Sequence, residues 1–341
     1  MADELEVHSS AIVLGVEGGG SKTRAVCAQL DGTVLATALG GGANPSHVED
    51  AVAAVHGTIR RALEASRRSA GDVAALVLGC AGLDSESDGV WARELTAVPG
   101  LRCSTREVND AEVAHVAAFL GGPGIIAVSG TGSAVWGRTE AGEPLRNYDL
   151  SHYARSAARF LAQDAVHALL NGEAVPADSR LSSAVFEHFG ASSLDELYAA
   201  VRANGRLEPR STHFRYALLA PAVTKAAFEG SPLACAICDE AARALVAGVE
   251  LVARAFAGPT VKVALVGGVA RSAYFEAKVR SVLAASTNRN YVVSELVLTP
   301  AGGAALLALE LAGTNPDAEV VTRLAKAPAE PVSAPSTSSS G

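Results

Sequence analysis

The chain has 341 residues, of which 49% are hydrophobic and 19% are charged, so it is long enough for two domains and too apolar for a disordered protein. A net charge of −8 without a lysine- or arginine-rich run argues against a nucleic-acid partner. No apolar run reaches the roughly 20 residues that span a bilayer, the acidic N-terminus is unlike a secretory signal, and five cysteines are too few for a disulfide scaffold. We therefore expect a cytoplasmic protein with no membrane partner.

Three strands are predicted near the start of the chain. The apolar run 11–16 is typical of a buried strand, and residues 24–30 and 33–39 follow with strand-like patterns. Asp31 and Gly32 favour a hairpin turn between the last two. Ser46 is the predicted N-cap of a helix that continues to about Ser69.

The elements that follow alternate between strands and helices, which indicates an α/β protein. In chain order they are a strand at 73–79, a helix at 84–95, a strand at 102–108, a helix from 111, and strands at 124–129 and 134–138. Residues 150–255 favour helices, with one long helix at 232–257. A strand at 261–268, a helix from about 272 and a last helix at 300–311 complete the pattern, and residues 327–341 predict a disordered tail.

A glycine-rich loop follows the first strand and contains Gly18, Gly19, Gly20, Ser21, Lys22 and Thr23. It differs from a P-loop because Ser21 separates the last glycine from Lys22 and because a strand, not a helix, comes next. Small residues still let a phosphate approach the backbone, and the hydroxyl and N–H groups can donate to it. An ordinary glycine-rich hairpin is the alternative interpretation.

A second loop of the same kind favours the phosphate interpretation. Gly130, Thr131, Gly132 and Ser133 lie at a strand end and are again followed by a strand. Two later glycine turns, at Gly267–Gly268 and at Gly302, could leave room for the adenine of a nucleotide. Together these loops predict a nucleotide cleft between two similar domains.

The order of the motifs resembles the sugar kinase, hsp70 and actin superfamily, and within it the N-acetylglucosamine kinase and BadF/BadG/BcrA/BcrD ATPase family. GVEGGGSKTR resembles the first phosphate motif, NDAEVA the segment with the catalytic aspartate, SGTGSAV the second phosphate motif and LVGGVARS the adenosine motif. The resemblance implies an α/β fold of two ribonuclease-H-like domains, of the actin and hexokinase type, that flank an ATP and substrate cleft. The first would span 10–122 and take the helix at 301–318, and the second would span 123–300.

The resemblance also implies roles for single residues. Asp110 would be the catalytic base, although an aspartate at this place could simply cap the next helix. Asn44 and Thr131 match substrate-binding positions, and Asn44 could equally be a turn residue before Pro45. Glu17 takes the place of an acidic residue near Mg²⁺, which would act through water. ATP and Mg²⁺ are the implied cofactors.

The sequence departs from the family after the second phosphate loop. The Gly-Gly-Trp-Gly and Gly-Asp-Glu-Gly-Ser stretches that hold the sugar in N-acetylglucosamine kinases are missing, and Tyr148 and Ala154–Arg155 stand in their place. Acidic residues lie nearby, in the loop 82–88, at Glu112 and at Asp149. We therefore predict an amine-bearing acceptor, such as an aminoglycoside-like or aminocyclitol compound, with Tyr148 and Asp149 among its contacts. Solvated helix-cap acids are the alternative.

Three functions remain open. The leading one is an ATP-dependent kinase that acts on a hydroxyl group of an amino sugar or aminocyclitol, with N-acetylglucosamine or glucosamine kinase as the nearest variant. The second is a BadF-type ATPase that activates a dehydratase through an iron–sulfur cluster, for which Cys80 and Cys103 are the candidate ligands, in a homodimer. The third is a sugar-sensing protein without turnover. Cys235 and Cys238 have CxxC spacing but fall within a helical pattern, so we expect structural cysteines.

Overall fold

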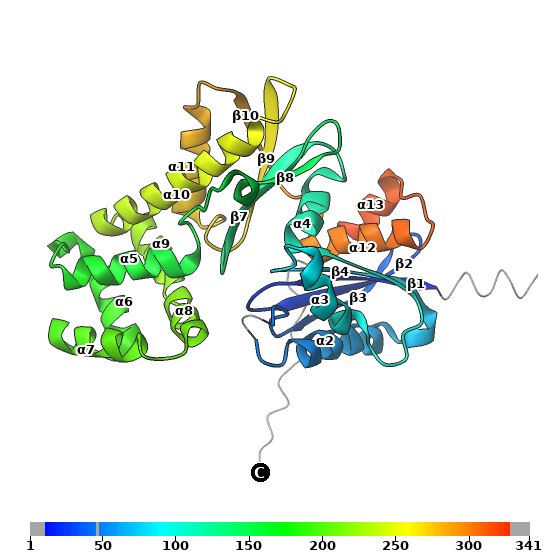
Figure 1. The fold of residues 1–341 in the computed structure, drawn as a ribbon, viewed down its shortest axis with the longest axis horizontal. Coiled ribbons are helices and arrows are strands. Elements are labelled where there is room, and N and C mark those ends of the chain that lie inside the picture. Colours follow the sequence, from blue (N-terminus) through cyan, green and yellow to red (C-terminus); the bar gives the residue numbers. More distant parts are fainter. Residues whose placement is uncertain (1–10, 46–47, 328–341) are drawn as a thin grey trace, which may run out of the picture. The chain divides into compact units, whose positions relative to one another are not determined.

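The computed structural model describes residues 11–45 and 48–327, and the chain divides into two compact units. Unit 1 comprises the residues up to Leu120 and those from Leu296 onward, and unit 2 comprises Gly121–Glu295. Each unit contains one five-stranded sheet with packed helices, which confirms the α/β class (Figure 1). Nearly all of the predicted tail at 327–341 lies outside the described residues.

The sheet of unit 1 has the order β3-β2-β1-β4-β5. Its strands are β1 (Ile12–Gly18), β2 (Thr23–Gln29), β3 (Val34–Gly40), β4 (Val73–Cys80) and β5 (Ser104–Asn109). The first three pair antiparallel, as the hairpin signals predict, and β4 and β5 join parallel to β1. A parallel pair needs a crossover connection, and α2 (Ala51–Ser66) and α3 (Gly89–Thr96) provide these connections.

Helices cover both faces of this sheet (Figure 1). Helices α2 and α3 pack on one face, while α4 (Asp110–Phe119), α12 (Pro300–Leu311) and α13 (Ala318–Leu324) pack on the other. The approach of α12 to β1 requires a glycine, because a Cβ atom at Gly15 would lie 2.1 Å from the backbone nitrogen of Ala305. Helix α12 is therefore part of the core that supports β1.

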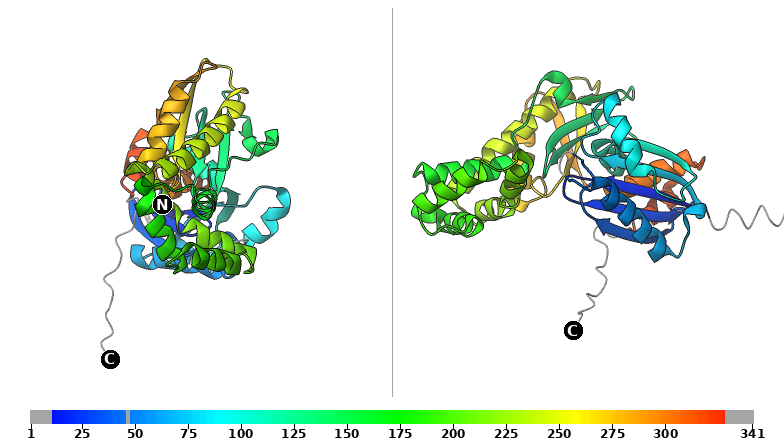
Figure 2. Two further views of the ribbon diagram at one scale, coloured as in Figure 1. Left: turned by 90° about the vertical axis from the view of Figure 1, so that its left-hand side faces the viewer. Right: turned by 60° about the horizontal axis from the view of Figure 1, so that its bottom comes forward.

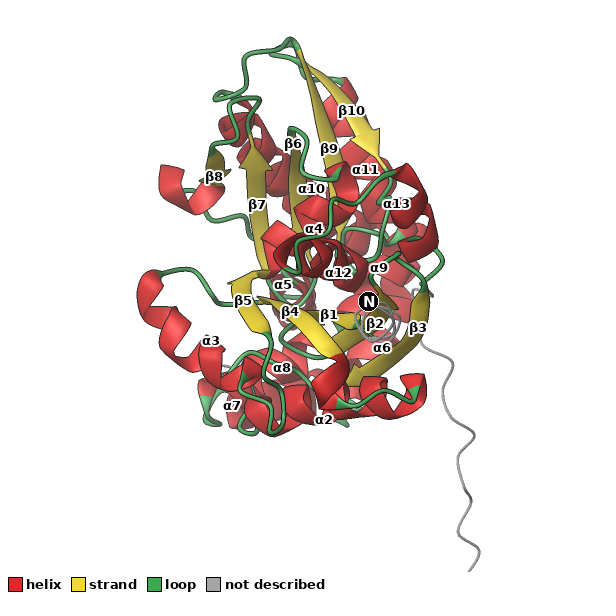
Figure 3. Cartoon of the chain, turned by 90° about the vertical axis from the view of Figure 1, so that its right-hand side faces the viewer, coloured by secondary structure: helices red, strands yellow, loops and turns green. Residues whose placement is uncertain are grey.

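The sheet of unit 2 repeats the arrangement of unit 1. Its strands are β6 (Gly124–Ser129), β7 (Ser133–Arg138), β8 (Pro144–Arg146), β9 (Thr260–Val266) and β10 (Asn290–Ser294). The order β8-β7-β6-β9-β10 has an antiparallel hairpin on one side of the central strand and two parallel strands on the other (Figure 3). Both units thus have the strand order expected of duplicated ribonuclease-H-like domains.

Unit 2 contains most of the helices. Helices α10 (Pro232–Ala253) and α11 (Ala273–Ala284) pack against its sheet. Five more helices belong to this unit (Figure 2): α5 (Ala158–Leu170), α6 (Ser179–Phe189), α7 (Leu194–Asn204), α8 (Pro209–Ala217) and α9 (Ala220–Phe228). Of these, α5 and α9 pack on α10, and the other three pack on α5 and α9. One continuous hydrophobic core runs from the sheet into this group. No helix among the described residues is long and apolar enough to cross a membrane.

Several predicted boundaries are wrong. Helix α2 begins at Ala51 with Asp50 as N-cap, and Ser46 lies outside the described residues. The helix predicted from Asp84 begins only at Gly89, because the Asp88 carboxylate accepts hydrogen bonds from the backbone of the preceding loop. Helix α10 ends at residue 253 rather than 257. The short elements β8, β10 and α13 were not predicted.

Candidate functional site

Three parallel strands of unit 1 end at the same edge of the sheet. In the strand register, Gly18 of β1 lies opposite Cys80 of β4, and Cys80 lies opposite Asn109 of β5. Neighbouring strands are about 4.8 Å apart. The glycine-rich loop after β1, the loop after β4 and Asp110 therefore meet at one edge.

Asp110 is the first residue of α4 and lies directly after β5. The N-cap is Asn109, whose side chain accepts a hydrogen bond from the Ala111 N–H at 2.9 Å, so the interpretation of Asp110 as the cap is wrong. Burial, and next the negative charge of Glu17, raise the pKa of Asp110 to about 7. A carboxyl group with this pKa exchanges its proton near neutral pH, as a general base must.

Glu17 lies at the end of β1 with little exposed surface. Burial raises its pKa, while the positive charges of Arg24 and Lys22 act in the opposite direction. Its Oε2 atom lies 3.8 Å from Nη1 of Arg24 and is buried without a hydrogen bond. A carboxylate oxygen in this state fits an interaction with a water of hydrated Mg²⁺.

The described residues contain no group of three or more side chains that could hold a metal ion by themselves. A magnesium ion at this edge would thus take most of its ligands from nucleotide phosphates and water, as Mg²⁺ commonly does. Glu17 would hold it through water, and the ion would screen the phosphate charge.

The glycine-rich loop after β1 is fixed by backbone hydrogen bonds. The Gly19 N–H donates to the Lys22 carbonyl at 2.8 Å, and the Ala81 N–H donates to the Gly18 carbonyl at 2.8 Å. Ser21 and Lys22 are exposed at the tip, with Gly19 and Gly20 partly exposed. The tip therefore presents small residues and backbone groups to solvent, as a phosphate loop requires.

The structure places Thr23 differently from the sequence prediction. Its side chain is fully buried, and its hydroxyl donates to the Gly41 carbonyl at 2.6 Å. Thr23 therefore anchors the loop to the chain after β3 and offers no donor to a phosphate. Asn44, farther along that chain, is also buried, with its amide against Gly82 in the loop after β4. It lies near the edge that carries Asp110.

In unit 2, the second glycine loop and the Gly267–Gly268 turn lie together. The Ser129 carbonyl accepts hydrogen bonds from Val269 and Ala270, at 3.1 and 2.9 Å. Gly267 has φ +102°, and a Cβ atom there would lie 2.4 Å from the same carbonyl oxygen. The predicted second phosphate motif and the predicted adenosine motif thus form one connected edge of the sheet.

The tip of this second loop is open. A Cβ atom at Gly132 or Gly268 would meet nothing within 4 Å, and Thr131, directly before Gly132, is half-buried. The Gly130 N–H donates to the Gly132 carbonyl at 2.9 Å, which closes the turn.

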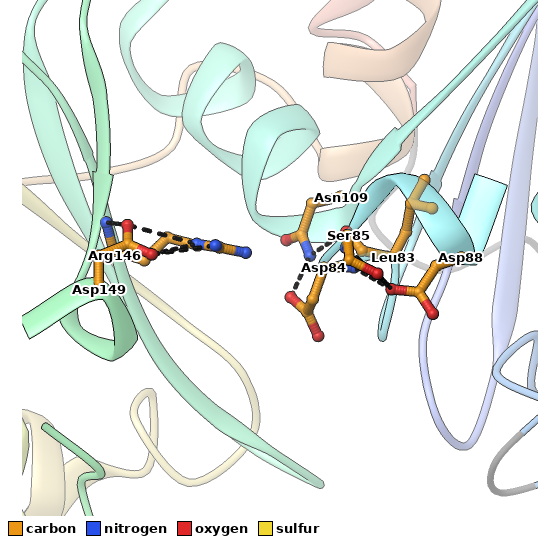
Figure 4. Close-up of polar contacts among 7 residues, drawn as sticks. All are labelled: Leu83, Asp84, Ser85, Asp88, Asn109, Arg146 and Asp149. Atoms are coloured by element: carbon orange, nitrogen blue, oxygen red, sulfur yellow. Dashed lines mark hydrogen bonds and ion pairs between the residues drawn. The ribbon is translucent and has the colours of Figure 1, made fainter. Parts of the chain in front are cut away.

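The segment that replaces the sugar-binding stretches is tied to this loop. Tyr148 donates its hydroxyl hydrogen to the Ser133 carbonyl, and the Ser133 hydroxyl donates to the Ala154 carbonyl at 2.6 Å. Asp149 accepts from the backbone and guanidinium of Arg146 at 2.8 and 3.0 Å (Figure 4). The Asp149 charge is thus offset by a residue of its own segment.

Other acidic residues behind the predicted amine preference also have partners. The Asp88 carboxylate accepts from Ser85, and Glu112 forms an ion pair with Arg106 at 2.7 Å. Asp84 accepts from the Asn109 amide at 3.0 Å (Figure 4). The side chain of Glu86 lies outside the described part of the chain.

Two further expectations need correction. Gly302 lies buried in the first turn of α12, where its N–H donates to the cap residue Thr299 at 3.1 Å, so it packs in unit 1 instead of lining an open turn. Cys103 precedes the start of β5, whereas Cys80 pairs with the end of that strand, which puts the two cysteines about 20 Å apart. One cluster cannot use both within one chain. Cys235 and Cys238 lie inside α10, as expected.

Sequence reasoning missed two residues at the site. The capping role of Asn109 was not predicted, although an Asn directly before a helix is a common N-cap residue. Arg159 at the start of α5 was not considered. The fold brings this helix end to the second glycine loop, where the Ala158 N–H donates to the Gly130 carbonyl at 2.7 Å.

Comparisons with known proteins identify the family of the chain. The model of the BadF/BadG/BcrA/BcrD ATPase family matches residues 14–308. An N-acetylmuramic acid/N-acetylglucosamine kinase from Clostridium acetobutylicum is 32% identical over 142 residues, which are 41% of this chain and 46% of that relative. The match thus spans about half the length of this curated relative.

Solved structures resemble the whole fold. A protein assigned as an N-acetylglucosamine kinase from Chromobacterium violaceum has 26% identity and a TM-score of 0.68, over 88% of this chain and 99% of that one. A ROK family glucokinase from Streptomyces griseus, in complex with glucose and AMPPNP, has 19% identity and a TM-score of 0.57, over 88% of this chain and all of that one. These similarities confirm the predicted two-domain fold.

Proposed function

The chain belongs to the BadF/BadG/BcrA/BcrD ATPase family, and we propose that it is an ATP- and Mg²⁺-dependent kinase that phosphorylates a hydroxyl group of an amino sugar. The observation that carries this proposal is the position of Asp110. Its carboxyl group, with a pKa of about 7, lies at the same sheet edge as the glycine-rich loop after β1. An ATP-consuming enzyme of this kind would work in the cytoplasm.

The proposed reaction assigns a task to each group. The glycine-rich loop after β1 binds a phosphate through its backbone N–H groups, and Ser21 adds a hydroxyl donor. The second glycine loop offers backbone N–H groups of its own to a phosphate. Asp110 removes the proton from the acceptor hydroxyl, while the oxygen of that hydroxyl forms a bond to the γ-phosphorus. The bond between the γ-phosphorus and the β–γ bridging oxygen breaks, and ADP leaves. Asn44, which can both donate and accept, would orient the acceptor.

The type of acceptor is the finer part of the proposal. An amino sugar agrees with the relative that phosphorylates N-acetylmuramic acid and N-acetylglucosamine. A preference for a free amine, as in glucosamine or an aminocyclitol, loses the support of the acidic residues, because Asp84, Asp88, Glu112 and Asp149 all have partners within the protein. A higher kcat/KM for glucosamine than for N-acetylglucosamine would be the evidence for a free-amine acceptor.

The alternative functions are less well supported. A BadF-type activator needs cysteines that converge on a cluster, and Cys80 is buried at the far end of the sheet from Cys103. A sensor without turnover has no need for a carboxyl group with a raised pKa beside a phosphate loop. Both alternatives would leave the acceptor unchanged.

The test is direct product analysis. The purified protein is incubated with ATP, Mg²⁺ and one acceptor at a time, and the sugar is examined by mass spectrometry. We expect a mass increase of one phosphate on at least one amino sugar, with one ADP formed per phosphate transferred. ATP hydrolysis without any phosphorylated sugar, across amino sugars and aminocyclitols, would contradict the proposal.

A further inference from the structure

Glu17 and Arg24 face each other across the first hairpin of unit 1. In the strand register Glu17 of β1 lies directly opposite Arg24 of β2, and only 17% and 21% of their side-chain surfaces are exposed. Side chains alternate between the two faces of a sheet, and Val13 and Val26, on the same face as this pair, belong to the core under α4 and α12. The pair therefore lies on the face that carries α4, whose first residue is Asp110.

The two side chains are in contact without a hydrogen bond between them. Nη1 of Arg24 lies 3.8 Å from Oε2 of Glu17, whereas charge-assisted hydrogen bonds are about 2.7–2.9 Å long. Oε2 of Glu17 and Nε of Arg24 are both buried and have no hydrogen-bond partner among the described residues. Buried polar atoms nearly always have a partner. One acceptor and one donor at this place are therefore open to a bound group.

The Glu17 carboxylate lies between attractive and repulsive charges. Arg24 and Lys22 attract it, and the effect of Arg24 is the larger. Asp110 acts in the opposite direction, because two ionised carboxylates repel each other. Lys22 is exposed at the tip of the glycine-rich loop, whereas Arg24 is fixed in a strand opposite the carboxylate. Arg24 is therefore the cation that holds Glu17 in place.

The other oxygen of the Glu17 carboxylate lies beside the glycine-rich loop. A Cβ atom at Gly19 would be 3.9 Å from Oε1 of Glu17. The carboxylate thus extends from Arg24 to the loop that would bind a phosphate of the nucleotide. An arginine that forms two parallel hydrogen bonds with a carboxylate uses the acceptor sites of both oxygens. The longer contact with Arg24 supplies attraction and leaves Oε2 able to accept a hydrogen bond.

We propose that Arg24 is a positioning residue for magnesium: it holds the Glu17 carboxylate at the sheet edge, with Oε2 free to accept a hydrogen bond from a water of the hydrated ion. The inference rests on the proposed function, in which Mg²⁺ accompanies ATP. Arg24 itself contacts neither the ion nor the nucleotide. Its effect on magnesium therefore depends entirely on Glu17, and this dependence distinguishes it from an arginine that binds a phosphate.

The test compares nucleotide affinity with and without the ion. The Kd of a non-hydrolysable ATP analogue is measured by calorimetry in Mg²⁺ and in EDTA, and the ratio of the two values gives the gain in affinity from magnesium. In Arg24→Met, which removes the charge, we expect this gain to fall about 3- to 30-fold, within the range for neighbouring side chains that are coupled. The Kd in EDTA should change by less than about twofold, since Arg24 does not contact the nucleotide.

Two further variants test how Arg24 acts. Arg24→Lys keeps the positive charge and should keep most of the gain from magnesium, because the 3.8 Å contact uses the charge of the guanidinium and not its paired hydrogen bonds. In Glu17→Gln the gain is already lost, so the addition of Arg24→Met should lower it no further. An equal effect of Arg24→Met in the presence and absence of the Glu17 carboxylate would overturn the inference, because Arg24 would then act without Glu17.

Arg106→Met is the matched control. Arg106 is also a strand arginine of unit 1 that pairs with a carboxylate, that of Glu112, at 2.7 Å. This variant should keep the full gain from magnesium. A Kd that rises equally in Mg²⁺ and in EDTA for Arg24→Met would overturn the inference, because it would assign Arg24 to the nucleotide. An unchanged gain in Arg24→Met would overturn it as well.

Because the measurement is of binding, its result does not depend on turnover, and the two proposals can fail separately. A loss of the gain from magnesium in Arg24→Met, for a protein that phosphorylates no acceptor, would support the role of Arg24 and refute the kinase function. Phosphorylation of an amino sugar by a protein whose gain from magnesium is the same with and without Arg24 would refute the positioning role alone.

Discussion

The side-chain amide of Asn109 donates hydrogen bonds to Oδ1 of Asp84 and to the Leu83 carbonyl, both at 3.0 Å (Figure 4). Its amide oxygen accepts from the Ala111 N–H at the start of α4. One side chain thus connects the helix that carries Asp110 to the loop after β4. Asn109 is a positioning residue, because its amide is used within the protein.

Asn109→Ala should remove both connections. We expect a loss of about 1–2 kcal/mol in the free energy of unfolding, as for other N-cap replacements, together with a lower kcat at saturating acceptor. Asp317→Ala is the matched control, because Asp317 caps α13. It should cost similar stability in urea unfolding and leave kcat unchanged. Equal kcat values for the two variants would show that Asn109 does not position Asp110.

The adjacent residues Gly267 and Gly268 provide a test of the nucleotide edge in unit 2. Gly267→Ala should raise the Kd for an ATP analogue at least about tenfold, because the residue has φ +102° and its Cβ would lie 2.4 Å from the Ser129 carbonyl oxygen. Gly268→Ala should fold with unchanged stability, since its Cβ would meet nothing within 4 Å.

Isothermal titration with a non-hydrolysable ATP analogue, paired with thermal unfolding, checks both variants. If Gly267→Ala binds the analogue as tightly as the unmodified protein, this turn is not part of the nucleotide site.

The packing of α12 on β1 predicts a large effect of one methyl group. In Gly15→Ala the new Cβ would lie 2.1 Å from the Ala305 nitrogen and 2.4 Å from the Ala301 oxygen, both backbone atoms that cannot move alone. We expect the free energy of unfolding to fall by about 3 kcal/mol or more. In Gly57→Ala, inside α2, the new Cβ would contact only the flexible end of the Arg61 side chain. This variant should raise the free energy of unfolding by about 0.5–1 kcal/mol. In chemical denaturation the two variants should change the free energy of unfolding in opposite directions. An unchanged free energy of unfolding in Gly15→Ala would contradict the described packing.

The raised pKa of Asp110 also has a consequence for stability. With a folded-state pKa of about 7 and an ordinary value of 3.8, the folded protein binds more protons than the unfolded chain between these pH values. The contribution of Asp110 to the free energy of unfolding is therefore fully present below pH 4 and is lost as the pH rises through 7. Asp110→Asn should gain stability relative to the unmodified protein over this window. A stability difference between the two proteins that does not change with pH would refute the shifted pKa.

Much of the fold could be predicted from the sequence, because its signals are local. Apolar runs such as 124–129 coincide with β6, and the change from an alternating to a helical pattern marks most of the other elements. The short strands β8 and β10 were missed because Pro144–Arg146 and Asn290–Ser294 are partly exposed and become strands only by pairing with a neighbour.

The site was predictable where residue type and position at a strand end coincide, as at Asp110 and the glycine loops. The hydrogen-bond and ion-pair partners of individual side chains were not predictable, because they depend on which groups the fold brings close. Nothing in the sequence showed that the Thr23 hydroxyl bonds to Gly41 or that Asp149 pairs with Arg146.

The role of Asp110 as the base is tested most directly by acceptor-dependent ADP release from Asp110→Asn. We expect kcat to fall by at least about two to three orders of magnitude, because only proton removal is lost, while binding of an ATP analogue changes little. Glu112→Gln is the control, since Glu112 lies in the same turn of α4 and forms a surface ion pair with Arg106. It should keep nearly full activity. Turnover by Asp110→Asn within a few-fold of the Glu112→Gln control would contradict the account.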